Sequence, residues 1–530
     1  MNPKHFVLIT LISSLSLASS MAVGEPTAAA PSSSQSAHRD AGISVQRVWT
    51  YAHGVANPGQ KAEIVAYDRH QDTLWVAGVI GVDVLDRATG QPLAHINVAN
   101  LGLVNSVAVH GNLAALAIEN ANDRTLPGVV VFYDTQTRRL SGAPVSVGSL
   151  PDMVTFTPDG RQLLVANEGT PNPRIKNSPL STTDPAGSVS IIDVRRRIVN
   201  TIPIDSSIPG YDTLRLFPAA GTKPTQPAAY TPYDPEPEYI AVDETGHRAY
   251  VGLQEANGIA VLDLHKGRFE RIFSLGLKDF SLQGNAIDPN DEDGQIGLRP
   301  APVQGLYQPD GIATYRYRGK TFIVTANEGD ARDNGDEDSE DERRGAAGDS
   351  SIEYVANGSE LARLTFSNVE SMRGGPLVAF GGRSFSIRNS EGELVFDSGS
   401  DLDRLAIERG IYNDGRSDNK GVEPEGVSLL EFKDRVLAFI GLERTLTSAT
   451  AIYDITNPNS VRFVDMIVAD GDVSPEGLKA FKARGRYYLA IANEVSDTTS
   501  LFAISIDGKH GDTNDGYRDD AMPCDQTSRC

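Results

Sequence analysis

Short runs in which apolar and polar residues alternate recur along most of the chain, and turn-forming residues separate them. In "MVTFTPDGRQLLVANEG" (153–169), two apolar runs flank the turn residues Pro-Asp-Gly. Alternation with a period of two around such a turn is typical of β-hairpins. The pattern therefore predicts an all-β fold.

The hairpin belongs to a longer unit that repeats. The unit contains a Pro-acidic pair, an apolar strand, a turn, a second apolar strand that often ends in Asn-Glu, a spacer and a third strand. Copies begin at residues 62, 105, 150, 236, 308, 423 and 474, and the first two are the weakest. One unit cannot bury both faces of its small sheet, so the copies should stack into a closed ring. We predict a seven-bladed β-propeller over residues 45–506; two stacked β-sandwiches are the alternative, and they would not explain the recurring motif.

The repeat places acidic residues at one end of each predicted hairpin. The acid after Pro begins the first strand and the glutamate of Asn-Glu ends the second, so the two should lie about 5 Å apart at the same rim. The inner carboxylates would be Asp152, Glu238, Asp310, Glu425 and Glu476, and the outer ones Glu119, Glu168, Glu328, Glu443 and Glu494. We expect the inner set to converge on one mouth of the central channel.

Carboxylates gathered in this way need compensation. Two unit charges 5 Å apart repel by about 3 kcal/mol at an effective dielectric constant near 20. Oxygen-rich sites suit Ca²⁺ or Mg²⁺. We expect Ca²⁺, with candidate ligands Asp152, Glu238, Asp310, Glu328, Glu425, Glu443, Glu476 and Glu494. The alternative is an architectural role in which the carboxylates accept backbone N–H groups, and we favour it for the outer ring.

Charged residues near the predicted rim suggest possible chemistry. Asp330 and Arg332 follow one Asn-Glu pair, Arg444 follows Glu443, and Arg416 precedes another Pro-acidic pair. Guanidinium groups beside a bound cation would suit an anionic ligand. Three functions stay open: a Ca²⁺-dependent binder of an anionic small molecule or an extracellular surface ligand, a Ca²⁺-dependent phosphomonoesterase that uses a metal-activated water, and a purely structural propeller.

Two long stretches, 265–306 and 330–422, interrupt the repeat. Insertions of this length are usually functional covers or disordered segments. The first contains Asp288, Asp291 and Asp293, a second candidate cation cluster of low specificity.

The net charge of −22 argues against a nucleic-acid-binding surface. Residues 1–22 have the pattern of a cleaved secretory signal, residues 23–44 that of a disordered leader, and residues 507–530 form a polar tail. Cys524 and Cys530 are the only cysteines and could pair in the tail. No later stretch is long and apolar enough for a transmembrane helix. We expect a secreted or periplasmic protein, and a monomer.

Several motifs taken together resemble one known family. They include "VTANEGDARD", "FGGRSFSI", "RSDNKGVEPEGV", "AFIGLER" and "YDITNP". In these motifs and their order, the chain from about 45 to 506 is similar to the choice-of-anchor I family of exported bacterial propeller proteins and to the mesenchyme-specific cell-surface glycoproteins of animals. The resemblance implies a secreted or surface-attached β-propeller, and some relatives carry alkaline-phosphatase or phytase-like labels. The segment "ERTLTSATAIYD" departs from the Gly-Gly that usually follows "GLER" in the family.

Overall fold

The described part of the chain folds largely into β-strands. The computed structural model describes residues 42–170, 185–216, 235–331, 341–345, 355, 359–371 and 374–506. Among these residues, the α-helices are α1 (His53–Ala56) and α2 (Asp401–Glu408). Short 3₁₀ turns occur at Tyr211–Thr213, Gln283–Asn285 and Asp414–Arg416. The all-β prediction is confirmed.

Seven of the eight sheets formed by the described residues are antiparallel. The first contains β2 (Val65–Asp68), β3 (Thr73–Gly78), β4 (Gly81–Asp86) and β5 (Pro92–Asn97), and the second contains β6 (Val104–His110), β7 (Leu113–Ile118), β8 (Pro127–Asp134), β9 (Arg139–Leu140) and β10 (Val145–Ser149). The third contains β11 (Pro151–Phe156), β12 (Gln162–Asn167), β13 (Ser188–Asp193) and β14 (Ile198–Pro203), and the fourth contains β15 (Pro237–Val242), β16 (Arg248–Leu253), β17 (Gly258–Asp263) and β18 (Arg268–Ser274). The fifth contains β21 (Ile312–Tyr317), β22 (Lys320–Asn327), β26 (Ser384–Asn389) and β27 (Leu394–Asp397). The sixth contains β28 (Pro424–Phe432), β29 (Arg435–Leu442), β30 (Ser448–Asp454) and β31 (Arg462–Ala469), and the seventh contains β32 (Pro475–Ala483), β33 (Arg486–Asn493), β34 (Thr498–Ile506) and β1 (Ile43–Ala52).

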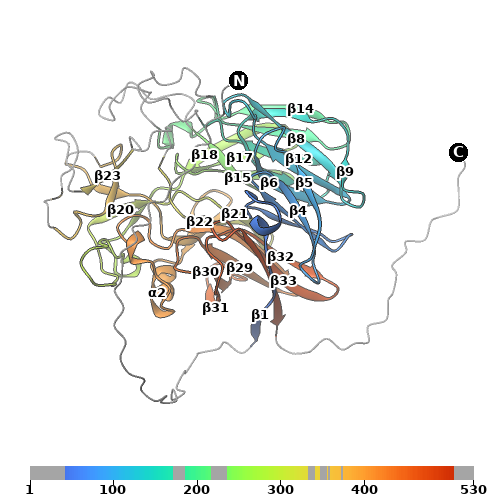
Figure 1. Ribbon diagram of the computed structural model, residues 1–530. Helices are drawn as coiled ribbons and strands as arrows, with labels where there is room; N and C mark the ends of the chain where they lie inside the picture. The colour runs from blue at the N-terminus through green and yellow to red at the C-terminus, as the bar shows by residue number, and fades with distance from the viewer. Residues whose placement is uncertain are drawn as a thin grey trace, which may run out of the picture. The chain divides into compact units, whose positions relative to one another are not determined.

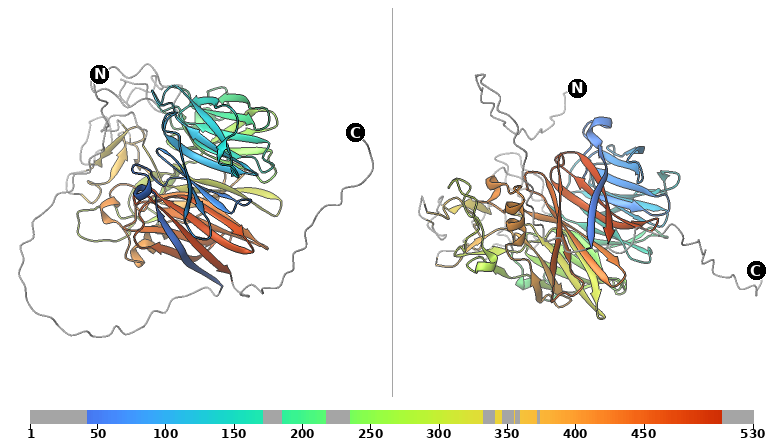
Figure 2. Two further views of the ribbon diagram at one scale, coloured as in Figure 1. Left: turned by 45° about the vertical axis from the view of Figure 1, so that its right-hand side comes forward. Right: turned by 90° about the horizontal axis from the view of Figure 1, so that it is seen from below.

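The first strands of these sheets form a ring (Figures 1 and 2). Along the chain, β2 contacts β6, β6 contacts β11, and the contacts continue through β15, β21 and β28 to β32. The ring closes because β32 also contacts β2. These strands enclose a central channel of about 410 Å³. The arrangement is β-propeller-like, as the repeat predicted.

Each second strand is buried on both faces because a neighbouring sheet packs against either side. Every residue of β3 is buried, and β12 is buried from Leu163 onwards. Apolar side chains of adjacent sheets form joint cores; the core between the third and fourth sheets, for example, combines Leu164 with Val251. Burial between the sheets thus holds the ring together.

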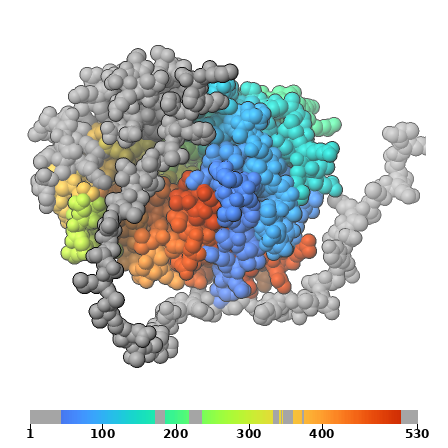
Figure 3. All heavy atoms as spheres, viewed as in Figure 1, coloured from blue at the N-terminus to red at the C-terminus, as the bar shows by residue number. Residues whose placement is uncertain are grey.

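The strand β1 completes the sheet that the end of the chain begins. It pairs antiparallel with β34, from Ile43 opposite Ile506 to Ala52 opposite Thr498. On the face shown in Figure 3, the blue and red parts of the described chain adjoin. Immediately after β1, the buried His53 binds Thr499 at 2.8 Å through Nε2. The repeat pattern did not assign a strand to this segment.

The ranges expected as insertions contain regular strands of the ring as well as an additional sheet. The strand β18 lies in the first range, and β26 and β27 lie in the second. The additional sheet has the order β19 (Leu277–Asp279), β20 (Val303–Leu306), β25 (Leu377–Ala379), β24 (Thr365–Ser367) and β23 (Glu342–Arg344), and β20 and β25 are parallel. The buried Lys278 fixes this sheet to the ring, since its Nζ lies 2.8 Å from a carboxylate oxygen of Asp397 in β27.

Candidate cation-binding site

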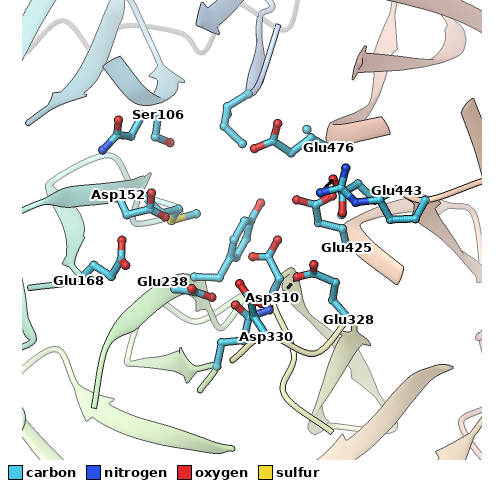
Figure 4. Close-up of a pocket in the computed structure, with 18 residues that line it drawn as sticks. Ser106, Asp152, Glu168, Glu238, Asp310, Glu328, Asp330, Glu425, Glu443 and Glu476 are labelled. Carbon is cyan, nitrogen blue, oxygen red and sulfur yellow. Dashed lines mark hydrogen bonds and ion pairs between the residues drawn. The ribbon is translucent and has the colours of Figure 1, made fainter. Parts of the chain in front are cut away.

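One end of the channel opens into a cavity of about 270 Å³ that is lined mainly by carboxylates (Figure 4). We call this cavity the acidic mouth. Its carboxylate residues are Asp152, Glu168, Glu238, Asp310, Glu328, Asp330, Glu425, Glu443 and Glu476. All five carboxylates that the sequence assigned to the inner ring are therefore brought together here.

The Pro-acidic pairs turn the inner carboxylates toward the mouth. In the sixth sheet, Pro424 lies opposite Leu442, and regular pairing resumes only at Val427. The third, fourth and seventh sheets have the same irregularity after their prolines. A bulge of this kind bends a strand and re-aims the side chain at the irregularity. Glu425 occupies that position and lines the mouth.

The residue before the proline positions the outer glutamate. Glu423 has a φ of 50°, and its carbonyl accepts the backbone N–H of Glu443 at 2.9 Å. Ser474 has a φ of 58° and accepts the N–H of Glu494 at 2.8 Å. Left-handed conformations of residues other than glycine cost about 1–3 kcal/mol and persist only where the surroundings fix them. The hairpin backbone therefore determines where the outer glutamates lie.

The asparagine side chain of the Asn-Glu pair forms its hydrogen bonds within its own sheet. Asn327 is fully buried, and its Nδ2 donates to Ser384 Oγ at 3.1 Å and to Ser386 Oγ at 2.7 Å. Its Oδ1 accepts the hydroxyl of Thr325 at 2.8 Å. The asparagine therefore serves the sheet, and only the glutamate reaches the mouth.

Sequence reasoning missed two positions of the inner ring. Asn105 lines the mouth at the position that Asp152 has in the third sheet. Glu63 has this position in the first sheet, and its charge acts on Glu476. Asn105 lies within β6 and Glu63 lies two residues before β2, but neither follows a proline, so the Pro-acidic signal did not find them. Glu494, in contrast, is half-buried and is not among the residues that line the mouth.

Burial raises the pKa values of the carboxyl groups at the mouth. Burial is the largest cause of the shift, and the negative charge of neighbouring carboxylates adds to the effect of burial. Together they raise the pKa values well above the ordinary range for Asp152, Glu238, Asp310, Glu425, Glu443 and Glu476. Burial also raises the pKa of Glu328 to about 7, although the nearby Lys420 opposes it. Burial and mutual repulsion therefore disfavour ionisation of these carboxyl groups, and a bound cation would counteract both effects.

Three carboxylate oxygens at the mouth lack a hydrogen-bond partner among the described residues. They are the buried Oε2 atoms of Glu238, Glu425 and Glu476 (Figure 4). Leaving a buried polar atom unsatisfied costs about 1–3 kcal/mol. Oxygen atoms without a donor fit a hard cation such as Ca²⁺.

Two of the candidate charged residues are held in ion pairs beside the mouth. Lys420 Nζ donates to Asp330 Oδ1 at 2.7 Å. Arg416 Nε donates to Glu423 Oε1 at 2.7 Å, and Glu423 is almost fully buried. Sequence reasoning missed Glu423 because its role depends on an arginine from the preceding loop. Arg416 and Asp330 are therefore each neutralised by a neighbour.

An outer group of carboxylates lies between the fifth and sixth sheets. One carboxylate oxygen each from Glu328, Glu423 and Glu443 lies within 4.8 Å of the others. Arg444 Nη2 lies 2.8 Å from Glu443 Oε1, so part of this negative charge is already compensated. Arg332 lies outside the described residues.

The second candidate cluster is bound to arginines. Arg299 lies 3.2 Å from Asp288 and 2.7 Å from Asp293, and Arg363 donates two hydrogen bonds of 2.8 Å to Asp291. Each of the three carboxylates thus has a cationic partner, and a metal would have to displace it.

The choice-of-anchor I domain matches residues 63–458. The chain belongs to this family. Among solved structures, it is similar to hydrazine synthase of Kuenenia stuttgartiensis, with 12% identity and a TM-score of 0.44 over 84% of this chain and 95% of that chain. It is also similar to a chain of the mitotic checkpoint complex, with 9% identity and a TM-score of 0.46 over 86% of this chain and 93% of that chain. No curated protein matches it. Within the described residues, no helix is long and apolar enough to cross a membrane.

Proposed function

We propose that this choice-of-anchor I protein is a secreted or periplasmic seven-bladed β-propeller that binds Ca²⁺ at its acidic mouth. The bound ion would present open coordination positions to an anionic small molecule or to an extracellular surface ligand. The seven antiparallel sheets and the closed contacts of their first strands support the blade number. Export would use the cleaved signal peptide over residues 1–22, which lies outside the described residues, as do Cys524 and Cys530.

The observation that carries the proposal is the set of unpartnered carboxylate oxygens of Glu238, Glu425 and Glu476. They come from different sheets, so no single hairpin can supply donors to all of them. Oxygen ligands of this kind favour Ca²⁺ or Mg²⁺ over softer metals. A cation would satisfy these oxygens and offset the repulsion within the ring.

Thermal melts of metal-free protein, with and without added Ca²⁺, test the proposal. A ligand of the native state at 100 times its Kd stabilises that state by about 2.7 kcal/mol, so Ca²⁺ should raise the Tm. The double variant E425Q/E476Q should lose most of this rise, because it removes two ligands and keeps their shape.

The matched control is E391Q, the same chemical change at an exposed position away from the mouth. It should respond to Ca²⁺ like the wild type. A Tm that is indifferent to Ca²⁺, together with no Ca²⁺ binding in calorimetry, would rule out the calcium-binding mouth.

The alternative, a Ca²⁺-dependent phosphomonoesterase, has less support. Arg416 and Arg444, which the sequence suggested for binding an anionic ligand, already lie in ion pairs with Glu423 and Glu443. A generic phosphate monoester incubated with the protein and Ca²⁺ decides between the two functions. Turnover that E425Q abolishes and E391Q retains would favour the esterase.

A further inference from the structure

The channel below the acidic mouth contains one strongly charged side chain. Its lining comes from the first strands of the ring, and among the lining residues Lys479 in β32 is the only Asp, Glu, Lys or Arg. The other lining residues are mainly apolar or carry hydroxyl groups. The mouth and the channel adjoin, since Met153 and Tyr239 line both. A negative mouth thus opens into a channel with a positive charge.

Lys479 forms no hydrogen bond or ion pair with any residue in the described part of the chain, in contrast to the paired Lys420 beside the mouth. Its side chain is open to the hollow of the channel while protein surrounds that hollow. Burial therefore lowers the pKa of Lys479, and no carboxylate opposes this effect. An ammonium group in such surroundings gains strongly from an anionic partner.

A hydroxyl group that also lines the channel lies on the strand next to that of Lys479. Ser428 Oγ accepts the backbone N–H of Ala480, the residue after Lys479, at 2.9 Å. Since this bond uses an acceptor position, the hydroxyl hydrogen of Ser428 can still donate to a ligand. Ser428 and Lys479 both line the channel, on the neighbouring strands β28 and β32.

The two charged regions are separate. Lys479 follows Glu476 by three residues on the same strand. At the rise of an extended strand, this corresponds to about 10 Å. Lys479 lines the channel and not the mouth, whereas Glu476 lines the mouth and not the channel.

We propose that Lys479 and Ser428 form an oxyanion site inside the channel, which takes a carboxylate or phosphate group from the ammonium and the hydroxyl. This site does not depend on Ca²⁺ at the mouth. Its failure and the failure of the calcium proposal are therefore distinguishable.

Calorimetry on metal-free protein tests the site, with inorganic phosphate in one arm and acetate in the other. The wild type should bind at least one of the anions, and the preferred one identifies the class of ligand. K479M should weaken binding at least about tenfold, the loss expected for a charge-assisted hydrogen bond. K479R keeps the charge and should retain binding, and S428A should weaken it less than K479M does.

The matched control is K482M, on the same strand but not among the residues that line the channel. It should bind like the wild type. A second measurement needs no variant: acylation of Lys479, followed by peptide mass spectrometry, should slow when the bound anion is present, while acylation of Lys482 should not. The proposal is overturned if the wild type binds neither anion, or if K479M binds as tightly as the wild type.

Discussion

Replacing Glu63 with Gln should stabilise the metal-free protein at pH 8. Burial, with help from the charge of Glu494, raises the pKa of Glu63 from 4.5 to about 8. Each pKa unit corresponds to about 1.36 kcal/mol, so this difference of about 3.5 amounts to at most about 5 kcal/mol. Gln keeps the length of the side chain and removes the charge, so the folded state no longer has to ionise a buried carboxyl group.

The same pKa difference sets the pH dependence of the effect. Because the folded-state pKa of Glu63 lies above its unfolded value, the folded state holds the proton more tightly. The stabilisation that comes from this tighter proton binding is fully present below about pH 4.5 and is lost as the pH rises through about 8. The gain from E63Q should therefore be large at pH 8 and small at pH 5.

Urea unfolding of metal-free protein at both pH values measures the gain as a change in the free energy of unfolding. The control is E391Q, which should stay within about 0.5 kcal/mol of the wild type because its side chain is exposed. The reasoning fails if E63Q is no more stable than the wild type at pH 8, or if it gains equally at both pH values.

Three further substitutions test buried contacts of the fold by the same urea assay. N327A should lower the free energy of unfolding by about 2 kcal/mol, since the buried Thr325 hydroxyl loses its acceptor and two buried serine hydroxyls lose the amide donor. No loss would contradict the role of the asparagine in its sheet. R215M should cost about 3–5 kcal/mol, because it leaves the carboxylates of Asp341 and Glu370 without the arginine that pairs with both; a neutral result would contradict this pairing. F439A should cost about 3–5 kcal/mol through the cavity it creates in a fully buried core; a change below 1 kcal/mol would contradict the packing between the sixth and seventh sheets.

The inner ring could be predicted from the sequence because it depends on local geometry. A hairpin places the start of one strand beside the end of the next, and the repeat shows that several hairpins are equivalent. Asp152 and Glu476 therefore reach one cavity although more than 300 residues separate them in the chain. The roles proposed for the ring in binding metal and ligand stay predictions.

Features that depend on long-range pairing could not be predicted in this way. The strand β1 lacks the repeat motif, and its partner β34 lies at the other end of the described chain. The ion pair that holds Asp291 depends on Arg363, which lies in another segment of the chain, and no local pattern reveals its approach. Glu423 likewise depends on Arg416 and on an unusual backbone conformation.

Where the second strand of a sheet ends and the third begins, two residues face each other, and these pairs show that the asparagine and the glutamate of Asn-Glu have different causes. The polar pairs are Asn167–Ser188, Asn327–Ser384 and Asn493–Thr498, and the apolar pairs are Leu253–Gly258 and Leu442–Ala449. The asparagine amide thus lies opposite a hydroxyl group, whereas the leucine lies opposite a residue that has no hydroxyl group. This matching is expected because buried polar groups need hydrogen-bond partners. Yet Glu328 follows an asparagine, Glu443 follows a leucine, and both line the mouth. Because the glutamate recurs with either kind of pair, the interior of the sheet does not explain it, and a shared role of Glu328 and Glu443 at the mouth stays a prediction.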